Sequence, residues 1–334
     1  DDGTLYAASC GSDGKLRLMK SRNGSAWTQV TTLGGVESLP DAALQWYQGS
    51  LYLGVMLSGS KPAAYRLTNG AWKQLWVSSE NYAMQPQWLE HQGTLYLGYV
   101  KSGTKALALQ KIAGSGAALP NLTVGSYLTN PALCSWNGKV FAVYSDFLSS
   151  KNTTKVAVCS GGKWSEVLDT GIAAGKLHAA ASCSSQMALI AGNDAGVDKL
   201  FLYDGKQWKS EDAAFARGAL EVQMFYYGSD LYASYIDKNQ QMALQKRTSS
   251  GWKQVGKPIA APVDSSASDV IFAKGVCYAA YVAQGTQNLL VRFHKLDPPS
   301  GGVVDPPKPK DDYTVSLTLA GTPSNSKIYI DGRA

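Results

Sequence analysis

The sequence predicts an all-β protein, a seven-bladed β-propeller of four-stranded antiparallel blades with a short C-terminal β segment. Three observations carry this prediction. A short apolar strand recurs seven times at nearly constant spacing, and a tryptophan that follows a glycine turn recurs with the same period. The composition agrees, because the 334 residues include 34 Gly, 18 Tyr and 9 Trp while only 17% are charged. Such a composition is typical of many short strands joined by tight turns.

The recurring strand sets the number of blades. Its copies begin at Leu5, Leu51, Leu95, Val140, Met187, Leu231 and Cys277. Successive copies therefore start 46, 44, 45, 47, 44 and 46 residues apart. Self-similarity with a period of roughly 40–50 residues is typical of propeller blades. The seven copies predict seven blades within residues 1–296.

The tryptophan marks the fourth strand of a unit. It occurs at Trp27, Trp72, Trp164, Trp208 and Trp252, and the third unit has lost it near Ala117. In the second unit we predict strands at 43–47, 51–57 and 63–68 and a fourth strand from Trp72. Turns that contain Gly or Asn-Gly separate the first strand from the second and the third from the fourth. Tight hairpins need such residues.

The two end units contribute three strands each. The first lacks a strand before Leu5, and the seventh runs into Asp297-Pro298 without a tryptophan strand. We expect these two units to pair and close the ring. They form two thinner blades, or a strand outside this count completes one of them. Six blades with merged ends is the alternative arrangement.

The last residues divide into two segments. Residues 297–311 predict a proline-rich linker, because proline fixes φ and removes a hydrogen-bond donor. Apolar alternation in residues 312–334 predicts two strands. Thr322-Pro323 and Ile330-Asp331-Gly332 resemble the start of a PEGA domain, a small β module of bacterial surface proteins. The resemblance implies a partial PEGA-like segment and further domains of the same polypeptide.

The repeat region also resembles a known group of propellers. Residues 21–27 (SRNGSAW) are similar to the Asp-box turn of sialidase-like propellers, without its usual Asp. Residues 11–18 (GSDGKLRL) resemble strands of tectonin-like lectin propellers. Residues 1–296 thus resemble bacterial seven-bladed propellers of the sialidase and lectin type. This resemblance implies that the tryptophan packs between blades, and the group includes lectins, scaffolds and some hydrolases.

Charge and motifs narrow the function classes. The net charge of +6 is spread along the chain without an arginine-rich stripe, so we expect no nucleic-acid partner. Apolar runs are short, so we expect no membrane insertion. His91, His178 and His294 fall in different units without metal-ligand spacing. No nucleophile-elbow, zinc-protease or phosphate-loop motif occurs. We therefore assign no catalytic residue, no metal and no cofactor.

The five cysteines are predicted to be mainly buried thiols that act as small apolar side chains. Two disulfides are the alternatives. Cys10 with Cys277 would join the first and last units, and Cys134 with Cys159 lie within one unit.

The candidate binding surface is the face that carries the long connections between blades and between second and third strands. Aromatic rings beside carboxylates suit sugars or peptides, because a ring stacks on an apolar face while polar groups bind hydroxyls or amides. The candidate ligand-binding residues are Tyr82, Tyr127, Asp146, Phe147, His178, Arg217, Glu221 and Asp269.

We therefore expect a secreted or cell-surface binding module that recognises a glycan or a protein through this face without catalysis. A glycoside hydrolase-like propeller enzyme is the first alternative. It would need a pair of carboxylates or a tyrosine nucleophile, which the sequence does not single out. A structural spacer within a multidomain surface protein is the second.

Overall fold

The fold is described from a computed structural model of the chain. It describes residues 4–10, 13–22, 26–36, 42–124, 127–147, 152–175, 177–193, 199–213, 215, 218–259, 262–273, 275–283, 288–296, 313–318 and 328–331.

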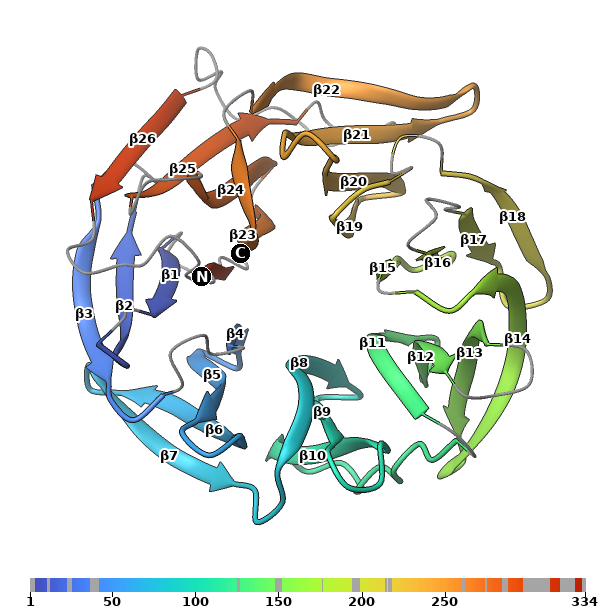
Figure 1. Ribbon diagram of the computed structural model, residues 1–334, viewed down its shortest axis with the longest axis horizontal. Helices are drawn as coiled ribbons and strands as arrows, with labels where there is room; N and C mark the ends of the chain where they lie inside the picture. Colours follow the sequence, from blue (N-terminus) through green and yellow to red (C-terminus); the bar gives the residue numbers. More distant parts are fainter. Residues whose placement is uncertain are drawn as a thin grey trace.

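Seven antiparallel sheets surround a central axis, and Figure 1 shows them as the blades of a ring. In the described part of the chain, six sheets have four strands and one has three. The prediction of a seven-bladed all-β propeller is confirmed, and the six-blade alternative is wrong. The sheets radiate from the axis, so each blade buries both faces against its neighbours.

The second to sixth blades follow chain order from the inner strand to the outer strand. The second comprises β4 (Ala42–Tyr47), β5 (Ser50–Leu57), β6 (Lys61–Thr68) and β7 (Ala71–Val77). The third comprises β8 (Tyr82–His91), β9 (Thr94–Lys101) and β10 (Leu107–Gly114). The fourth comprises β11 (Tyr127–Trp136), β12 (Lys139–Phe147), β13 (Thr153–Ser160) and β14 (Lys163–Ala173). The fifth comprises β15 (Leu177–Ser182), β16 (Met187–Gly192), β17 (Lys199–Tyr203) and β18 (Trp208–Asp212). The sixth comprises β19 (Glu221–Tyr227), β20 (Asp230–Ile236), β21 (Met242–Thr248) and β22 (Gly251–Ile259).

The two end blades are each completed by a strand from the C-terminal segment. The first blade contains β1 (Leu5–Cys10), β2 (Leu16–Ser21) and β3 (Thr28–Leu33), and β27 (Ile328–Asp331) pairs with β1 as its inner strand. The seventh contains β23 (Val263–Ala273), β24 (Val276–Ala283) and β25 (Asn288–Lys295), and β26 (Tyr313–Thr318) pairs with β25 as its outer strand. Both end blades therefore have four strands.

The linker prediction for residues 297–311 lies outside the described residues. For residues 312–334 the structure shows the backbone pairing of β26 and β27. The resemblance of this segment to a PEGA-like module stays a prediction.

The tight turns follow from residues that accept positive φ. In the turn between β6 and β7, Asn69 and Gly70 have φ of 51° and 76°. Two consecutive residues at positive φ match the right-handed twist of the flanking strands. The turn between β11 and β12 uses Asn137 and Gly138 in the same way, with φ of 47° and 70°.

The third blade shows the effect of the lost tryptophan. Its sheet contains three strands, and the chain after β10 pairs with β10 only through a bridge between Leu107 and Leu122. Two backbone hydrogen bonds of 3.0 and 2.9 Å form this bridge. The segment thus covers the outer edge of the blade without forming a strand.

The core lies between the blades, where each strand tryptophan packs against the preceding blade. Trp72 packs against a cluster that includes Leu18 of the first blade, and Trp208 packs against one that includes Phe141 of the fourth. The packing that the family resemblance implies is confirmed for these residues.

Cys134, Cys159 and Cys277 are buried free thiols, and Cys183 is a half-buried one. The prediction of buried thiols is confirmed for the first three. Both disulfide alternatives are wrong, because a disulfide requires close sulfur atoms and Cys277, Cys134 and Cys159 are all free.

Among the described residues, no helix has the length and the apolar content needed to cross a membrane.

Candidate functional site

The propeller has two unlike faces. The turn face carries the hairpin turns between first and second and between third and fourth strands of each blade. The loop face carries the other connections. Inner strands run from the loop face to the turn face, so His178 and Glu221 lie near the loop face while Gln92 and Tyr226 lie near the turn face. The central channel runs between these two faces.

The structure places the described candidate residues toward the loop face. Tyr82, Tyr127 and Glu221 begin inner strands, and Asp146 and Phe147 end β12. The side chains of Tyr82 and Tyr127 lie outside the described part of the chain, as does all of Arg217. The remaining candidates form two separate groups rather than one pocket.

The first group joins the fourth and fifth blades. Asp146 is buried, and its Oδ2 lies 3.2 Å from Lys155 Nζ. The same ammonium group lies 3.2 Å from Glu166 Oε2. Burial opposes the charge on Lys155, but hydrogen bonds to Glu166 and Asp146 outweigh it and raise the pKa of Lys155. Asp146 is therefore held by its own blade, whereas Phe147 beside it is half-buried.

His178 contacts a serine, but the arrangement is not that of a general base beside a catalytic nucleophile. His178 Nε2 lies 3.2 Å from Ser145 Oγ and 3.4 Å from Thr154 Oγ1. Ser145 is fully buried and its hydroxyl donates to the Gly175 carbonyl at 2.7 Å. The same oxygen accepts from Gly175 N–H at 2.9 Å. Because its proton is held by a backbone carbonyl, Ser145 ties two blades together and is not activated.

The second group joins the sixth and seventh blades. Gln223 Nε2 donates to Glu221 Oε1 at 3.3 Å, and Gln223 Oε1 accepts from the Val270 N–H at 3.0 Å. The same N–H lies 2.8 Å from Asp269 Oδ1. Glu221 and Asp269 thus belong to a network that links neighbouring inner strands. This network lies in the sixth and seventh blades, whereas the first group lies in the fourth and fifth.

A cavity lies in the central channel near the turn face, and none of the eight candidate residues lines it. We call it the channel cavity; its volume is about 560 Å³. Five inner strands line it, from β4 to β19 (Figure 1). Its aromatic lining residues are Trp88, Phe225 and Tyr226. Its polar lining residues are Gln45, Glu90, Gln92, Ser135 and Ser182.

Hydrogen bonds between blades hold this lining in place. Trp88 Nε1 donates to the Ala43 carbonyl at 2.9 Å, and Ser182 Oγ donates to the Ser135 carbonyl at 3.0 Å. His91 Nδ1 lies 2.9 Å from Ser135 Oγ. His91 is buried, and burial lowers its pKa, so the pair is a neutral contact between adjacent strands. The Trp88 ring, Ser135 and Ser182 are therefore held in place beside the cavity.

The sequence pattern does not predict the channel lining, because a tryptophan within a strand, such as Trp88, usually packs in the core. Trp88 does pack in the core, yet it also lines the cavity. Polar residues near the end of an inner strand and in the turn that follows it, such as Glu90 and Gln92, are the available signal. Their position beside one cavity follows from the arrangement of the blades around the axis.

Comparison with known proteins supports the fold. No protein-family model matches the chain, and no curated protein matches it. A lectin of Aleuria aurantia in complex with Fucalpha1-6GlcNAc is 12% identical, with a TM-score of 0.52 over 87% of this chain and 99% of that one. The SapL1 lectin in complex with alpha methyl fucoside is 12% identical, with a TM-score of 0.55 over 80% and 99%. YjhT is 11% identical, with a TM-score of 0.52 over 76% and 94%. The chain is a seven-bladed propeller similar in structure to these proteins.

Proposed function

We propose that the chain is a non-catalytic glycan-binding module that holds its ligand in the channel cavity. The single observation that carries the proposal is the lining, in which three aromatic residues lie beside amide, hydroxyl and carboxylate residues around a cavity of about 560 Å³. Ligand pockets of about 300–1,000 Å³ with a few placed polar groups are usual for small ligands. A ring binds the C–H face of a sugar while amides and hydroxyls bind its hydroxyl groups.

The structural neighbours support the same class of ligand. The two lectins are described in complex with fucosides, and their fold matches most of this chain. At 12% identity this likeness concerns the fold, so the ligand class rests on the cavity chemistry. The proposal therefore names a glycan and no particular sugar.

The lining favours binding over hydrolysis. Among the residues that line the channel cavity, Glu90 is the one carboxylate. Glycoside hydrolysis by the usual route needs two carboxyl groups about 5–10 Å apart across the scissile bond. A hydrolase-like propeller and a spacer remain the competing proposals. We also retain secretion or surface attachment and bacterial origin as proposals that follow from the family resemblance.

The test is a glycan array probed with the full chain, followed by titration of the best glycan. Glu90 and Gln92 are exposed lining residues, so their replacement spares the core. We expect Glu90→Ala with Gln92→Ala to weaken binding at least tenfold. The matched control, Asp212→Ala with Gln254→Ala, removes an exposed carboxylate and amide elsewhere and should leave binding unchanged.

Three outcomes would replace the proposal. Loss of binding in Phe147→Ala, with the cavity variant unaffected, would move the site to the loop face predicted from the sequence. Release of shortened sugars from the bound glycan would establish the hydrolase. Absence of binding to every arrayed glycan would favour the spacer or a protein partner.

A further inference from the structure

The interface between the sixth and seventh blades lacks the tryptophan that fills the equivalent space elsewhere. Packing against the preceding blade is seen for Trp27, Trp72, Trp164, Trp208 and Trp252. No tryptophan follows Trp252 in the sequence, so the seventh blade contains no tryptophan. The clusters that the described residues form at this interface contain no tryptophan.

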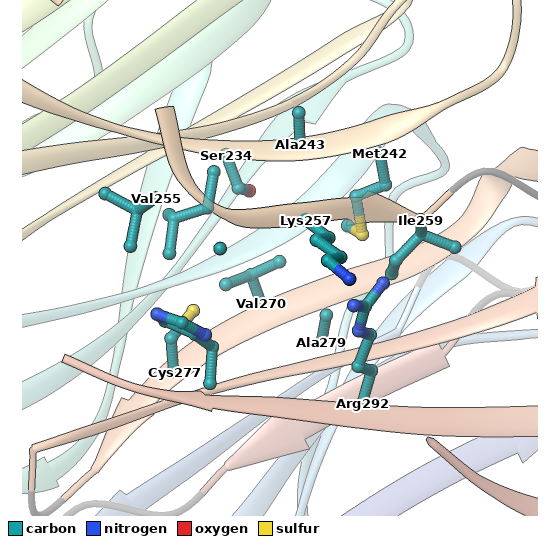
Figure 2. Close-up of a pocket in the computed structure, with 13 residues that line it drawn as sticks. Ser234, Met242, Ala243, Val255, Lys257, Ile259, Val270, Cys277, Ala279 and Arg292 are labelled. Atoms are coloured by element: carbon teal, nitrogen blue, oxygen red, sulfur yellow. The ribbon is translucent and has the colours of Figure 1, made fainter. Parts of the chain in front are cut away.

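The third blade also lacks a strand tryptophan, but other aromatic residues pack at its interface with the second blade. At the interface of the second and third blades, Trp76 packs on Tyr99 with ring centroids 5.6 Å apart. Trp88 packs edge-on against Tyr52 at 6.2 Å. At the interface of the sixth and seventh blades a pocket of about 50 Å³ remains open, and Figure 2 shows its lining. We call it the interblade pocket.

The walls of the interblade pocket are mainly apolar, and the charged side chains that line it are cationic. Figure 2 shows Val255, Val270 and Cys277 on one side, and Lys257 and Arg292 near Met242 and Ile259 on the other. None of the 13 lining residues is Asp or Glu. An apolar pocket with two cations and no lining carboxylate has the chemistry to hold an anion that carries a small apolar body.

A bulge in β22 places one of these cations. Met242 pairs with Ile259 and Leu244 pairs with Val255, so β22 has two extra residues at this point. Gly256 within the bulge has a φ of 64°, and a Cβ there would lie 2.9 Å from His294 Nδ1. Arg292 Nη1 donates to the Pro258 carbonyl at 3.2 Å across the interface. Lys257 and Arg292 therefore approach the pocket from opposite blades.

We propose that the interblade pocket binds a carboxylate group on a compact apolar body, a ligand separate from that of the channel cavity. No residue lines both cavities. A water-sized group needs about 10–15 Å³ of such volume, so the pocket holds roughly four of them, enough for a carboxylate and one or two carbons. The carboxylate belongs either to a free short-chain acid or to an acidic sugar residue of a glycan, of which only the carboxylate and the carbons beside it enter the pocket.

The thiol in the wall does not alter this assignment. Burial raises the pKa of Cys277 to about 12, so the group is a neutral thiol near pH 7 and lines the pocket as an apolar surface. The site is thus one of reversible binding.

The test uses the full chain labelled with ¹³C at the methionine methyl groups, and Met242→Leu identifies the Met242 signal. We expect propionate and methyl glucuronide to shift that signal with saturation, while neutral methyl glucoside leaves it in place. If methyl glucuronide binds at least tenfold more tightly than propionate, the source is an acidic sugar; similar affinities indicate a free acid. Absence of any saturable Met242 shift with either acid overturns the proposal.

Variants of the two cations give the second readout. Lys257→Gln and Arg292→Gln should each weaken carboxylate binding about tenfold, whereas Lys253→Gln on the same strand should not. Thermal unfolding checks that Arg292→Gln remains folded, since its bond to Pro258 is lost. Lys257 is exposed and makes no such bond among the described residues, so unchanged binding in folded Lys257→Gln would also overturn the proposal.

Discussion

At the scale of single residues, equivalent tryptophans differ in one hydrogen bond. Trp164 and Trp72 are each the second residue of an outer strand, and both pack between blades. Trp164 Nε1 donates to the Pro120 carbonyl of the third blade at 2.8 Å. Trp72 Nε1 is buried and has no hydrogen-bond partner among the described residues. The pair therefore separates the contribution of the hydrogen bond from that of the ring.

We predict that Trp164→Phe destabilises the protein by about 1–2 kcal/mol more than Trp72→Phe. Both changes shorten the aromatic side chain, but the first also leaves the Pro120 carbonyl without its donor, while the second removes an unsatisfied N–H. Urea unfolding of the two variants measures the difference. Equal losses would show that the indole hydrogen bond adds nothing to stability.

Thiol reactivity should follow burial. Burial raises the pKa of Cys134 to about 11 and that of Cys277 to about 12, so the reactive thiolates are scarce near pH 8. In a Cys10→Ser background, we expect a disulfide reagent to label half-buried Cys183 first in the native state. Cys134, Cys159 and Cys277 should react only after unfolding. Rapid native labelling of Cys277 would contradict the buried environment assigned to it.

At the scale of strands, glycine in the repeated second strand permits close approach of neighbouring blades. A Cβ at Gly98 of β9 would lie 2.6 Å from Leu133 Cδ1 of the fourth blade. At the equivalent position of β5, a Cβ at Gly54 would lie 2.5 Å from Leu97 Cδ1. The repeated Leu-Tyr-Leu-Gly motif thus specifies spacing between blades as well as a strand.

We predict that Gly98→Ala destabilises the protein by about 1–3 kcal/mol, because overpacking forces side chains away from their preferred conformations. Gly103→Ala is the control, since nothing lies within 4 Å of a Cβ at that position. Thermal unfolding should show a lower midpoint for the first variant and little change for the second. A midpoint equal to that of the unmodified chain for Gly98→Ala would show that the blades adjust freely.

At the scale of the whole molecule, the two C-terminal strands complete the first and the seventh blades. β27 pairs with β1 over four residues, and β26 pairs with β25 over six. Without them, the first blade lacks an inner strand and the seventh lacks an outer one. Strand edges with unpaired N–H and C=O groups favour aggregation and pair less of the backbone.

We therefore predict that truncation after Leu296 lowers the unfolding midpoint and promotes aggregation. Truncation after Thr318 keeps β26 and removes β27, and it should give an intermediate midpoint. Thermal unfolding with light scattering measures both. A chain ending at Leu296 that stays monomeric with an unchanged midpoint would contradict a closing role for these strands.

The local sequence determined the blades of this protein. Strand alternation, Asn-Gly turns and the recurring tryptophan depend on neighbouring residues. The seven blades, the limits of β4 to β6 within two residues and the start of β7 could therefore be predicted from the chain alone. The missing tryptophan of the third unit was also visible in the sequence, and it corresponds to the one three-stranded sheet.

Only the tertiary structure decided which side chains meet. Glu90, Ser135 and Tyr226 belong to different units, and they share a cavity because the ring brings their inner strands to one axis. The partners of Asp146 and His178 likewise came from folding, since both are engaged between strands. Contacts between repeats depend on the rotation from one blade to the next, a property that no local pattern of residues encodes.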